Sequence, residues 1–296
     1  MKHTARFFVE HQLSEETEVM LADHQMHHAS NVLRLGKNDS LILFNGYSGE
    51  WNCEIIDVKK RRIRCLNILR EQIEERGPIL AISLINPARM SILLEKTTEL
   101  GVSEIVPVIS RYTQHKRLNI EKAKSIVIGA AEQSRRMTVP KIHDPVELST
   151  FLSRLANVTL DPFTNLDSAS TSKIAQAYNA FSFVETTSTS HSQAHHAYHA
   201  TGSKAENARV ADAEAETRVL QALVVGDETM SGIPIKDALD ENVAFLIGPE
   251  GGFSAEEMKM MDSYNFVKKV TMGKNILRSE TAAITAIALW SILWNG

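Results

Sequence analysis

The sequence predicts an α/β protein with a small β-rich domain, residues 1–72, followed by a larger domain, residues 73–296, built on a parallel sheet. From Ile79 onward, apolar runs typical of buried strands alternate with helical segments that carry apolar residues on one face. Such alternation is typical of a parallel sheet with helices on its faces. A charged stretch without apolar periodicity, residues 71–77, ends at Pro78 and is interpreted as the linker between the domains.

Composition limits the class of protein. The chain has 296 residues, 43% of them hydrophobic, which is enough for one large core or two modest ones. Its formal net charge of −4 gives no overall indication of nucleic-acid binding, although a local basic cluster can still provide it. The two cysteines, Cys53 and Cys65, exclude a disulfide scaffold and a cysteine-type zinc site. Because the sequence begins without a signal-peptide pattern and has no membrane-length apolar run, we expect a soluble, cytoplasmic protein without membrane contact.

The first 72 residues contain three candidate strands, and a strong turn signal, Asn45-Gly46, follows the first of them. The expected strands are 40–44, 50–58 and 65–69, and a helix is expected over 23–35. A basic cluster, residues 59–64, separates the last two strands. Two interpretations stay open on the residues alone: a solvated turn, or an RNA-binding hairpin beside the histidine- and arginine-bearing helix.

The larger domain continues the alternation of strands and helices. The expected strands are 79–85, 104–109, 158–160, 220–225, 243–247 and 266–271. The expected helices are 89–100, 120–136, 146–155, 254–264 and 279–294. Gly101 follows the first helix as a stop signal, and Ser254 with Glu257 forms a capping box at the start of the fourth.

An apparent insertion, residues 164–213, interrupts this pattern with a composition rich in Ser, Thr, Ala, Asn, Gln and His. His191, His195 and His199 follow one another at four-residue intervals, which on a helix is a metal-ligand spacing. The segment has no acidic or cysteine partner nearby and no core to hold the geometry, so we expect no metal site there or elsewhere.

Three of the later strands end in glycine-bearing loops, and ligands of open parallel sheets bind beyond the carboxyl ends of the strands. The three loops lie at Gly226, at Gly248-Pro249-Glu250-Gly251-Gly252, and at residues 273–278. Neither GxGxxG nor GxxxxGK[ST] occurs, and a loop with an acid and a proline suits phosphate poorly. The pocket better fits a neutral or cationic adenosine ligand such as S-adenosylmethionine.

Paired motifs around these loops carry a family resemblance. They are Leu246-Ile247-Gly248-Pro249-Glu250-Gly251-Gly252 with Leu277-Arg278-Ser279-Glu280-Thr281-Ala282, together with Arg89-Met90, the segment 96–102, Ala131-Glu132-Gln133-Ser134 with Arg136, and His28 with Val32-Leu33-Arg34. This set resembles the bacterial 16S ribosomal RNA uracil-N3-methyltransferase family, which belongs to the knotted SPOUT methyltransferases. The sequence departs from the family pattern at Ser110-Arg111-Tyr112 and has Arg89 where the family has lysine.

The resemblance implies a SPOUT α/β fold with a C-terminal trefoil knot, preceded by a PUA-like β-barrel domain. It also implies a homodimer, S-adenosylmethionine as cofactor, and 16S ribosomal RNA within the small ribosomal subunit as partner. The cofactor-binding residues implied are Leu223, Val225, Gly226, Leu246, Ile247, Gly248, Pro249, Glu250, Gly251, Gly252, Met272, Gly273, Ile276, Leu277 and Thr281. The RNA contacts expected are Arg6, His28, Arg34, Lys59, Lys60, Arg61, Arg62, Arg89 and Arg136.

Two residues are expected to take part in catalysis. Arg278 is placed to stabilise negative charge on the uracil carbonyls, and the alternative role is a salt bridge to Glu280 or to the partner subunit. Glu280 is a candidate base for the N3 proton, and the alternative role is a helix-capping acid. Two other functions remain open: a related enzyme with another RNA target, or a ribosome-assembly factor that binds RNA without catalysis.

Overall fold

The computed structural model describes residues 5–158 and 220–294. Most of the expected strand 158–160 and the whole insertion 164–213, with its histidine series, lie outside the described residues. The chain divides into two compact units, of which one comprises Met1–Leu148 and Ala222–Gly296 and the other Ser149–Gln221. The second unit contributes helix α4 (Leu148–Val158) to the described residues. The sequence predicted that this helix starts at residue 146. In the structure it starts at Leu148, because Val146–Glu147 form strand β9.

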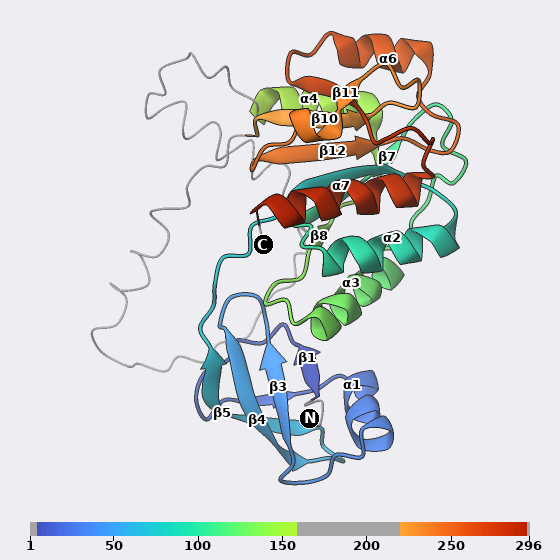
Figure 1. Cartoon of the computed structure of the whole chain (residues 1–296). Helices are drawn as coiled ribbons and strands as arrows, with labels where there is room; N and C mark the ends of the chain where they lie inside the picture. Colours follow the sequence, from blue (N-terminus) through green and yellow to red (C-terminus); the bar gives the residue numbers. More distant parts are fainter. Residues whose placement is uncertain (1–4, 159–219, 295–296) are drawn as a thin grey trace, which may run out of the picture. The chain divides into compact units, whose positions relative to one another are not determined.

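The N-terminal part is a five-stranded sheet with the strand order β1-β3-β4-β5-β2 (Figure 1). Its strands are β1 (Arg6–Phe8), β2 (Glu18–Met20), β3 (Ser40–Phe44), β4 (Glu50–Asp57) and β5 (Arg62–Arg70). Strand β1 runs parallel to β3, and the other pairs are antiparallel. The expected helix 23–35 is instead a short α-helix, α1 (Asp23–His27), continued by a π-helical turn, η1 (His28–Val32).

The C-terminal part is an eight-stranded sheet in which every pairing is parallel, as expected from the alternation. The order is β11-β13-β10-β12-β6-β7-β8, with β9 beside β7. Its strands are β6 (Ile79–Ser83), β7 (Glu104–Ile109), β8 (Lys141–Ile142), β9, β10 (Ala222–Gly226), β11 (Ile233–Pro234), β12 (Val243–Ile247) and β13 (Val267–Thr271). Because β10, β12 and β13 are parallel, the loops that follow them leave the sheet at one edge.

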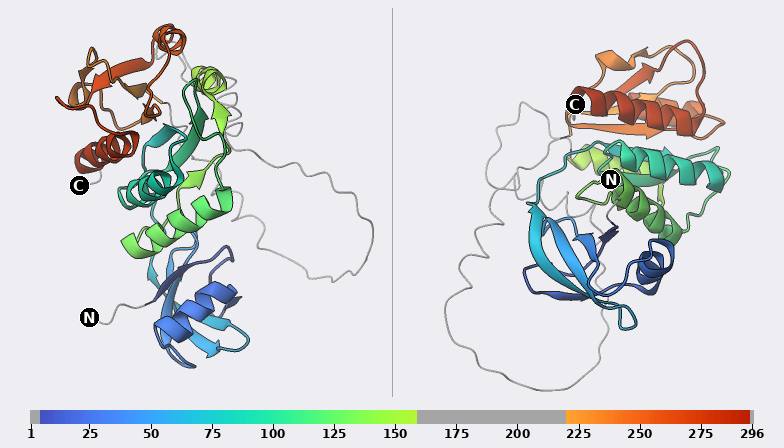
Figure 2. Two further views of the ribbon diagram at one scale, coloured as in Figure 1. Left: turned by 90° about the vertical axis from the view of Figure 1, so that its right-hand side faces the viewer. Right: turned by 60° about the horizontal axis from the view of Figure 1, so that its bottom comes forward.

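The helices of this part are α2 (Pro87–Glu99), α3 (Ile120–Ser134), α6 (Ala255–Asp262), α7 (Ser279–Trp294) and the 3₁₀ turn η2 (Ile235–Asp237). Local signals fix their ends. Asn86 caps α2, with Pro87 in its first turn. Ser254 and Glu257 make the expected capping box of α6. The left-handed Arg135 (φ 62°) ends α3. Helix α7 packs against both α2 and β12, and the two views in Figure 2 show α7 (red) alongside α2 (teal).

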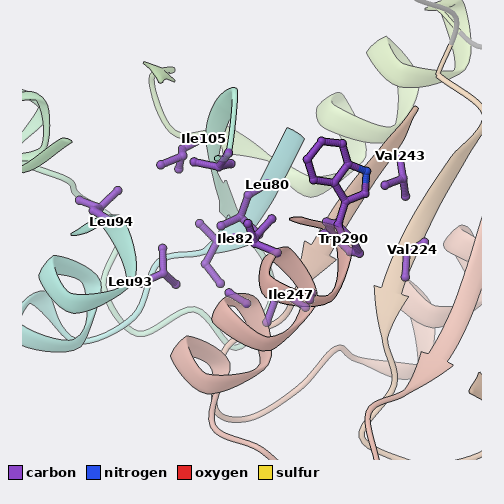
Figure 3. Close-up of a cluster of buried hydrophobic side chains, with 14 of the residues drawn as sticks. Leu80, Ile82, Leu93, Leu94, Ile105, Val224, Val243, Ile247 and Trp290 are labelled. Atoms are coloured by element: carbon purple, nitrogen blue, oxygen red, sulfur yellow. The ribbon is translucent and has the colours of Figure 1, made fainter. Parts of the chain in front are cut away.

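Two separate cores hold the chain. The N-terminal core includes Leu41, Cys53, Ile63 and Cys65, all without solvent exposure. The C-terminal core lies between the parallel sheet and the α2–α7 layer, where Trp290 packs beside side chains of neighbouring strands (Figure 3). The indole nitrogen of Trp290 donates to the carbonyls of Asp240 and Glu241, so the polar end of this buried ring is satisfied. The presence of two separate cores supports a division into two domains. The position of the domain boundary at residue 72 stays a prediction.

The joint between the two cores is polar and largely buried. The side chain of Arg6 lies over the ring of Phe44, 3.6 Å from its centroid, and pairs with Glu50. Arg6 also donates to backbone carbonyls at the end of α3, including that of Ala131 at 3.0 Å. From the other direction, Glu132 accepts a hydrogen bond from the backbone N–H of Phe8 at 2.9 Å.

The segment expected to be a linker is bonded into this joint. The carboxylate of Glu75 accepts from the backbone N–H groups of Met137 and Thr138, from the Thr138 hydroxyl, and from Arg136. Burial raises the pKa of Glu75, but these donors and the charge of Arg136 outweigh it, so the net pKa is lowered. Among the described residues, no helix has the length and apolar character needed to cross a membrane.

Candidate functional site

A cavity opens at the carboxyl ends of β10, β12 and β13, where the sequence predicted three loops to meet. Its free space, including the open mouth, is about 770 Å³. It is lined by Gly226, Asp227, Glu228, Thr229 and Met230 of the first loop; Ile247, Gly248, Pro249, Gly252 and Phe253 of the second; Val270, Thr271, Met272, Gly273, Asn275, Ile276 and Leu277 of the third; and Met258, Ser279 and Ala282.

The middle loop needs its glycines for steric reasons. Gly252 has φ +67°, and a Cβ added there would meet the Glu228 carboxylate at 1.7 Å. At Gly248 an added Cβ would stand 3.0 Å from the ring of Phe253. The hydroxyl of Ser279, the first residue of α7, donates to the carbonyl of Gly248 at 2.7 Å. The loop is therefore bonded directly to the second motif, as their pairing in the sequence indicated.

Nine of the predicted cofactor residues line the cavity: Gly226, Ile247, Gly248, Pro249, Gly252, Met272, Gly273, Ile276 and Leu277. The other six do not line it, and their contact with the cofactor stays a prediction. Leu223, Val225 and Leu246 lie within strands β10 and β12, and their side chains are fully buried. Thr281 is exposed on α7, while Glu250 and Gly251 occupy the outer end of their loop.

The first loop supplies four lining residues that were not among the predicted cofactor residues, namely Asp227, Glu228, Thr229 and Met230. Asp227 organises it, because one carboxylate oxygen accepts from the N–H and hydroxyl of Thr229 and the other from the Ser231 hydroxyl. Burial raises the pKa of Asp227, but these hydrogen bonds outweigh it and lower the net pKa, so the group stays ionised. An Asp followed by Thr and Ser at alternate positions is a turn signature, and this signal was available in the sequence.

The two expected catalytic residues differ in their surroundings. Arg278 is exposed, and the described part of the chain provides no ion-pair partner for it. The alternative salt bridge between Arg278 and Glu280 is not formed; Arg89 faces Glu280 instead, at 3.6 Å. The second carboxylate oxygen of Glu280 is buried and accepts no hydrogen bond in the described structure. Both residues thus keep hydrogen-bonding capacity for a ligand.

Four of the expected RNA contacts, His28, Arg34, Lys59 and Lys60, are exposed on the N-terminal part. Arg61 and Arg62 of the basic cluster are partly neutralised by ion pairs with Asp23 and Glu18.

Three other expected RNA contacts have internal partners. Arg6 and Arg136 are buried at the joint, where their guanidinium groups donate to protein carbonyls and pair with carboxylates. We therefore reassign Arg6 and Arg136 from RNA contact to the joint. Arg89 pairs with Glu250 and Glu280 beside the cavity.

The segment that departs from the family pattern contacts the cavity loops. Ser110 is buried and exchanges hydrogen bonds with Thr113 and Ser83. The backbone N–H of Arg111 donates to Glu257 in the first turn of α6 at 2.7 Å. A Cβ added at Gly251 would stand 3.3 Å from the Cβ of Tyr112, so the departure lies beside the glycine loop.

Comparisons with known proteins agree with this architecture. A family model described as an RNA methyltransferase domain matches residues 75–192 and 204–291, and one described as an RNA methyltransferase PUA domain matches residues 21–66. The chain is 30% identical to ribosomal RNA small subunit methyltransferase E of Rickettsia conorii, over 96% of this chain and 93% of the relative. It is 22% identical to the enzyme of that name from Bacillus subtilis, over 96% and 94%.

Among solved structures, the chain is similar to a ribosomal RNA small subunit methyltransferase E from Neisseria gonorrhoeae bound to S-adenosyl methionine. The two chains are 25% identical, with a TM-score of 0.66 and coverage of 99% of this chain and 98% of the other. The cavity at the glycine loops, the parallel sheet around it and the match over nearly the whole chain lead to one assignment. The chain belongs to the ribosomal RNA small subunit methyltransferase E family, and it combines a PUA domain with an RNA methyltransferase domain.

Proposed function

We propose that this protein uses S-adenosylmethionine to methylate N3 of a specific uridine in the 16S ribosomal RNA of the small ribosomal subunit. The observation that carries the proposal is the cavity beyond β10, β12 and β13, walled by the paired glycine-loop and α7 motifs of the family. The names of the relatives, ribosomal RNA small subunit methyltransferases, support the ribosomal target class. The uridine N3 position follows from the motif resemblance.

The chemistry of the cavity favours this cofactor. Its lining contains two acidic residues, Asp227 and Glu228, and neither lysine nor arginine. A cavity of that charge suits a sulfonium cation and disfavours the phosphates of a nucleotide, because the acidic side chains repel phosphate and no lysine or arginine of the lining offsets them. Met258, Met272 and Phe253 give apolar surface on which an adenine ring can pack. S-adenosylmethionine, when bound, supplies the electrophilic methyl group.

Two residues beside the cavity suit the remaining requirements of the reaction. Uracil N3 carries a proton that must leave before the nitrogen can attack, and the resulting negative charge spreads over the two carbonyl oxygens. We propose that Arg278, which is exposed and has no ion-pair partner among the described residues, stabilises that charge. Glu280 holds a carboxylate oxygen without a donor, which makes it the candidate acceptor for the N3 proton.

We further propose that the protein acts as a cytoplasmic homodimer. Helix α7 is apolar around its whole circumference, and its last turn exposes Ile292, Leu293 and Trp294. Ile92 of the neighbouring helix α2 is also half exposed. Apolar surface of this kind on a packed helix pair suits a second copy of the chain. The C-terminal trefoil knot that the family resemblance implies is part of the same proposal.

The RNA is proposed to contact the N-terminal part through its exposed cations, His28, Arg34, Lys59 and Lys60. Family membership and the matching PUA domain support this placement. Because Arg61 and Arg62 already pair with acids, we expect them to contribute less to RNA affinity than the two lysines.

The test is transfer of a tritiated methyl group from S-adenosylmethionine to small ribosomal subunits that lack the modification. Incorporation into 16S RNA and recovery of N3-methyluridine on nucleoside analysis is the expected result. Another methylated nucleoside would identify a related enzyme with a different target. Binding of cofactor and subunits without any incorporation would favour an assembly factor and contradict the proposal.

A further inference from the structure

Arg89 joins two acidic residues that come from different segments around the cavity. It lies in the first turn of α2, where its Nη1 is 3.1 Å from Oε1 of Glu250 and its Nε is 3.6 Å from Oε1 of Glu280. Glu250 belongs to the glycine loop after β12, and Glu280 to the first turn of α7. One guanidinium group therefore links a helix, a loop and a second helix.

Neither carboxylate lines the cavity, but the residues next to each of them do. Pro249 precedes Glu250, and Gly252 lies two positions after it. Ser279 precedes Glu280 and also donates to the carbonyl of Gly248. Two connections therefore join the loop to the start of α7: the hydrogen bond from Ser279 to Gly248, and the ion pairs of Arg89. Of these two, only the ion pairs of Arg89 also involve α2.

The loop needs such connections because of its composition. Its glycines lose more conformational freedom on ordering than other residues do, so an unrestrained loop would sample many arrangements. The planar guanidinium fork reaches two carboxylates in fixed directions, which a lysine ammonium on a flexible stem reproduces only in part. Glu280, only 14% exposed, also needs a counter-charge because a buried carboxylate without one is costly.

We propose that Arg89 is a positioning residue for the cofactor site: it holds the loop 248–252 against the start of α7 without touching the ligand. The inference rests on the proposed function in one respect, namely that the cavity binds S-adenosylmethionine and its product. It replaces the sequence-based expectation that Arg89 contacts RNA.

The experiment measures the Kd of S-adenosylhomocysteine by calorimetry, with thermal melts, for the full-length protein and its variants. Arg89→Met and Glu250→Gln should each weaken binding about three- to tenfold, because the pair is partly exposed and its strength modest. The double variant should bind about as weakly as either single variant, since both remove the same connection. Arg89→Lys should restore part of the affinity.

Lys96→Met is the matched control, because Lys96 lies on the same helix and pairs with Glu95 and Glu99 of that helix. It should leave the Kd unchanged. A folded Arg89→Met protein with unaltered Kd overturns the inference, as does additive weakening in the double variant. If Arg89→Met does not fold, Glu250→Gln decides alone, since Glu250 is an exposed loop residue. Failure of the unaltered protein to bind S-adenosylhomocysteine would contradict the proposed function, and the inference with it.

Discussion

Charged residues are arranged differently at the joint between the two cores and around the cavity. At the joint, the buried guanidinium groups of Arg6 and Arg136 each have a carboxylate partner and carbonyl acceptors. Around the cavity, Arg278 and Glu228 have no ion-pair partner among the described residues, and one oxygen of Glu280 has no donor. The same residue types are thus fully bonded in one region and partly unbonded in the other.

The difference follows from the cost of removing charge from water. A charge buried permanently must be paired, or the fold loses several kcal/mol. A polar group intended for a ligand must keep its capacity until the ligand arrives, so functional sites retain unsatisfied groups that the rest of the fold must compensate. We therefore expect substitutions at the joint to reduce stability, and substitutions at the cavity to reduce binding or turnover.

The largest expected effect is at the joint. Glu50→Ala removes the carboxylate that pairs with both Arg6 and Arg70, and the Arg6 side chain is only 7% exposed. A buried cation left unpaired should lower the free energy of unfolding by about 3 kcal/mol, measured by urea denaturation. The control Glu18→Ala breaks the exposed pair with Arg62 and should cost less than about 1 kcal/mol. Equal losses in the two variants would contradict the distinction.

At the cavity, Arg278→Ala should reduce methyl-transfer turnover about a hundredfold, as loss of a charge-stabilising donor does in other enzymes. The Kd of S-adenosylhomocysteine and the melting temperature should change little, because Arg278 is exposed and forms no ion pair within the described residues. Single-turnover kinetics and calorimetry provide the two measurements. Unchanged turnover would remove Arg278 from the catalytic residues.

A smaller effect is expected from Gly252→Ala. The new methyl group would occupy the position of the Glu228 carboxylate, and the φ of +67° costs a non-glycine residue about 1–2 kcal/mol. The strained φ should lower the melting temperature, and the displaced Glu228 side chain should weaken S-adenosylhomocysteine binding, because Glu228 lines the cavity. Gly273→Ala is an informative comparison, since its φ of +118° is equally unsuited to alanine but nothing lies within 4 Å of the added atom. Equal loss of affinity in both would exclude a specific role for the Glu228 contact.

The smallest effect depends on pH. The folded-state pKa of Glu75 lies below its usual value, so the ionised form stabilises the fold at pH above about 4.3, the ordinary glutamate pKa. This contribution is lost as the pH falls through the lowered folded-state pKa. Glu75→Gln should therefore destabilise the protein by about 1–2 kcal/mol at pH 7, and the difference from the unaltered protein should shrink in acid. A difference that stays constant between pH 7 and pH 3 would contradict this assignment.

The sequence predicted best those elements whose ends carry local chemical signals. Strand β12 and helix α7 have the expected bounds, because an apolar run ending in glycine and a Ser-Glu helix start each define a boundary. The short edge strands β1 and β2 were missed, since three residues each give too little alternation to detect. Three of the predicted cofactor residues, Leu223, Val225 and Leu246, lie inside the strands before the loops and are fully buried, a placement that an apolar run alone does not reveal.

The joint was not predictable in the same way. Arg6 and Ala131 are far apart in the sequence, and nothing local to either of them indicates the other. Side-chain to backbone contacts over such separations arise from the packing of whole domains and leave no periodic pattern. For the same reason, the positive charge of Arg6 and Arg136 was interpreted from the sequence as a sign of RNA contact. In the structure, both side chains donate hydrogen bonds to carbonyls of the protein itself.

The two cysteines give the N-terminal core a chemical reporter of its own. Cys53 and Cys65 face each other on β4 and β5, with 3.6 Å between their sulfurs, and neither is exposed to solvent. The chain has only these two thiols, so an alkylating reagent can modify it only when this core opens. The rate of labelling under native conditions therefore measures the local opening free energy of the N-terminal core, independently of the methyltransferase part.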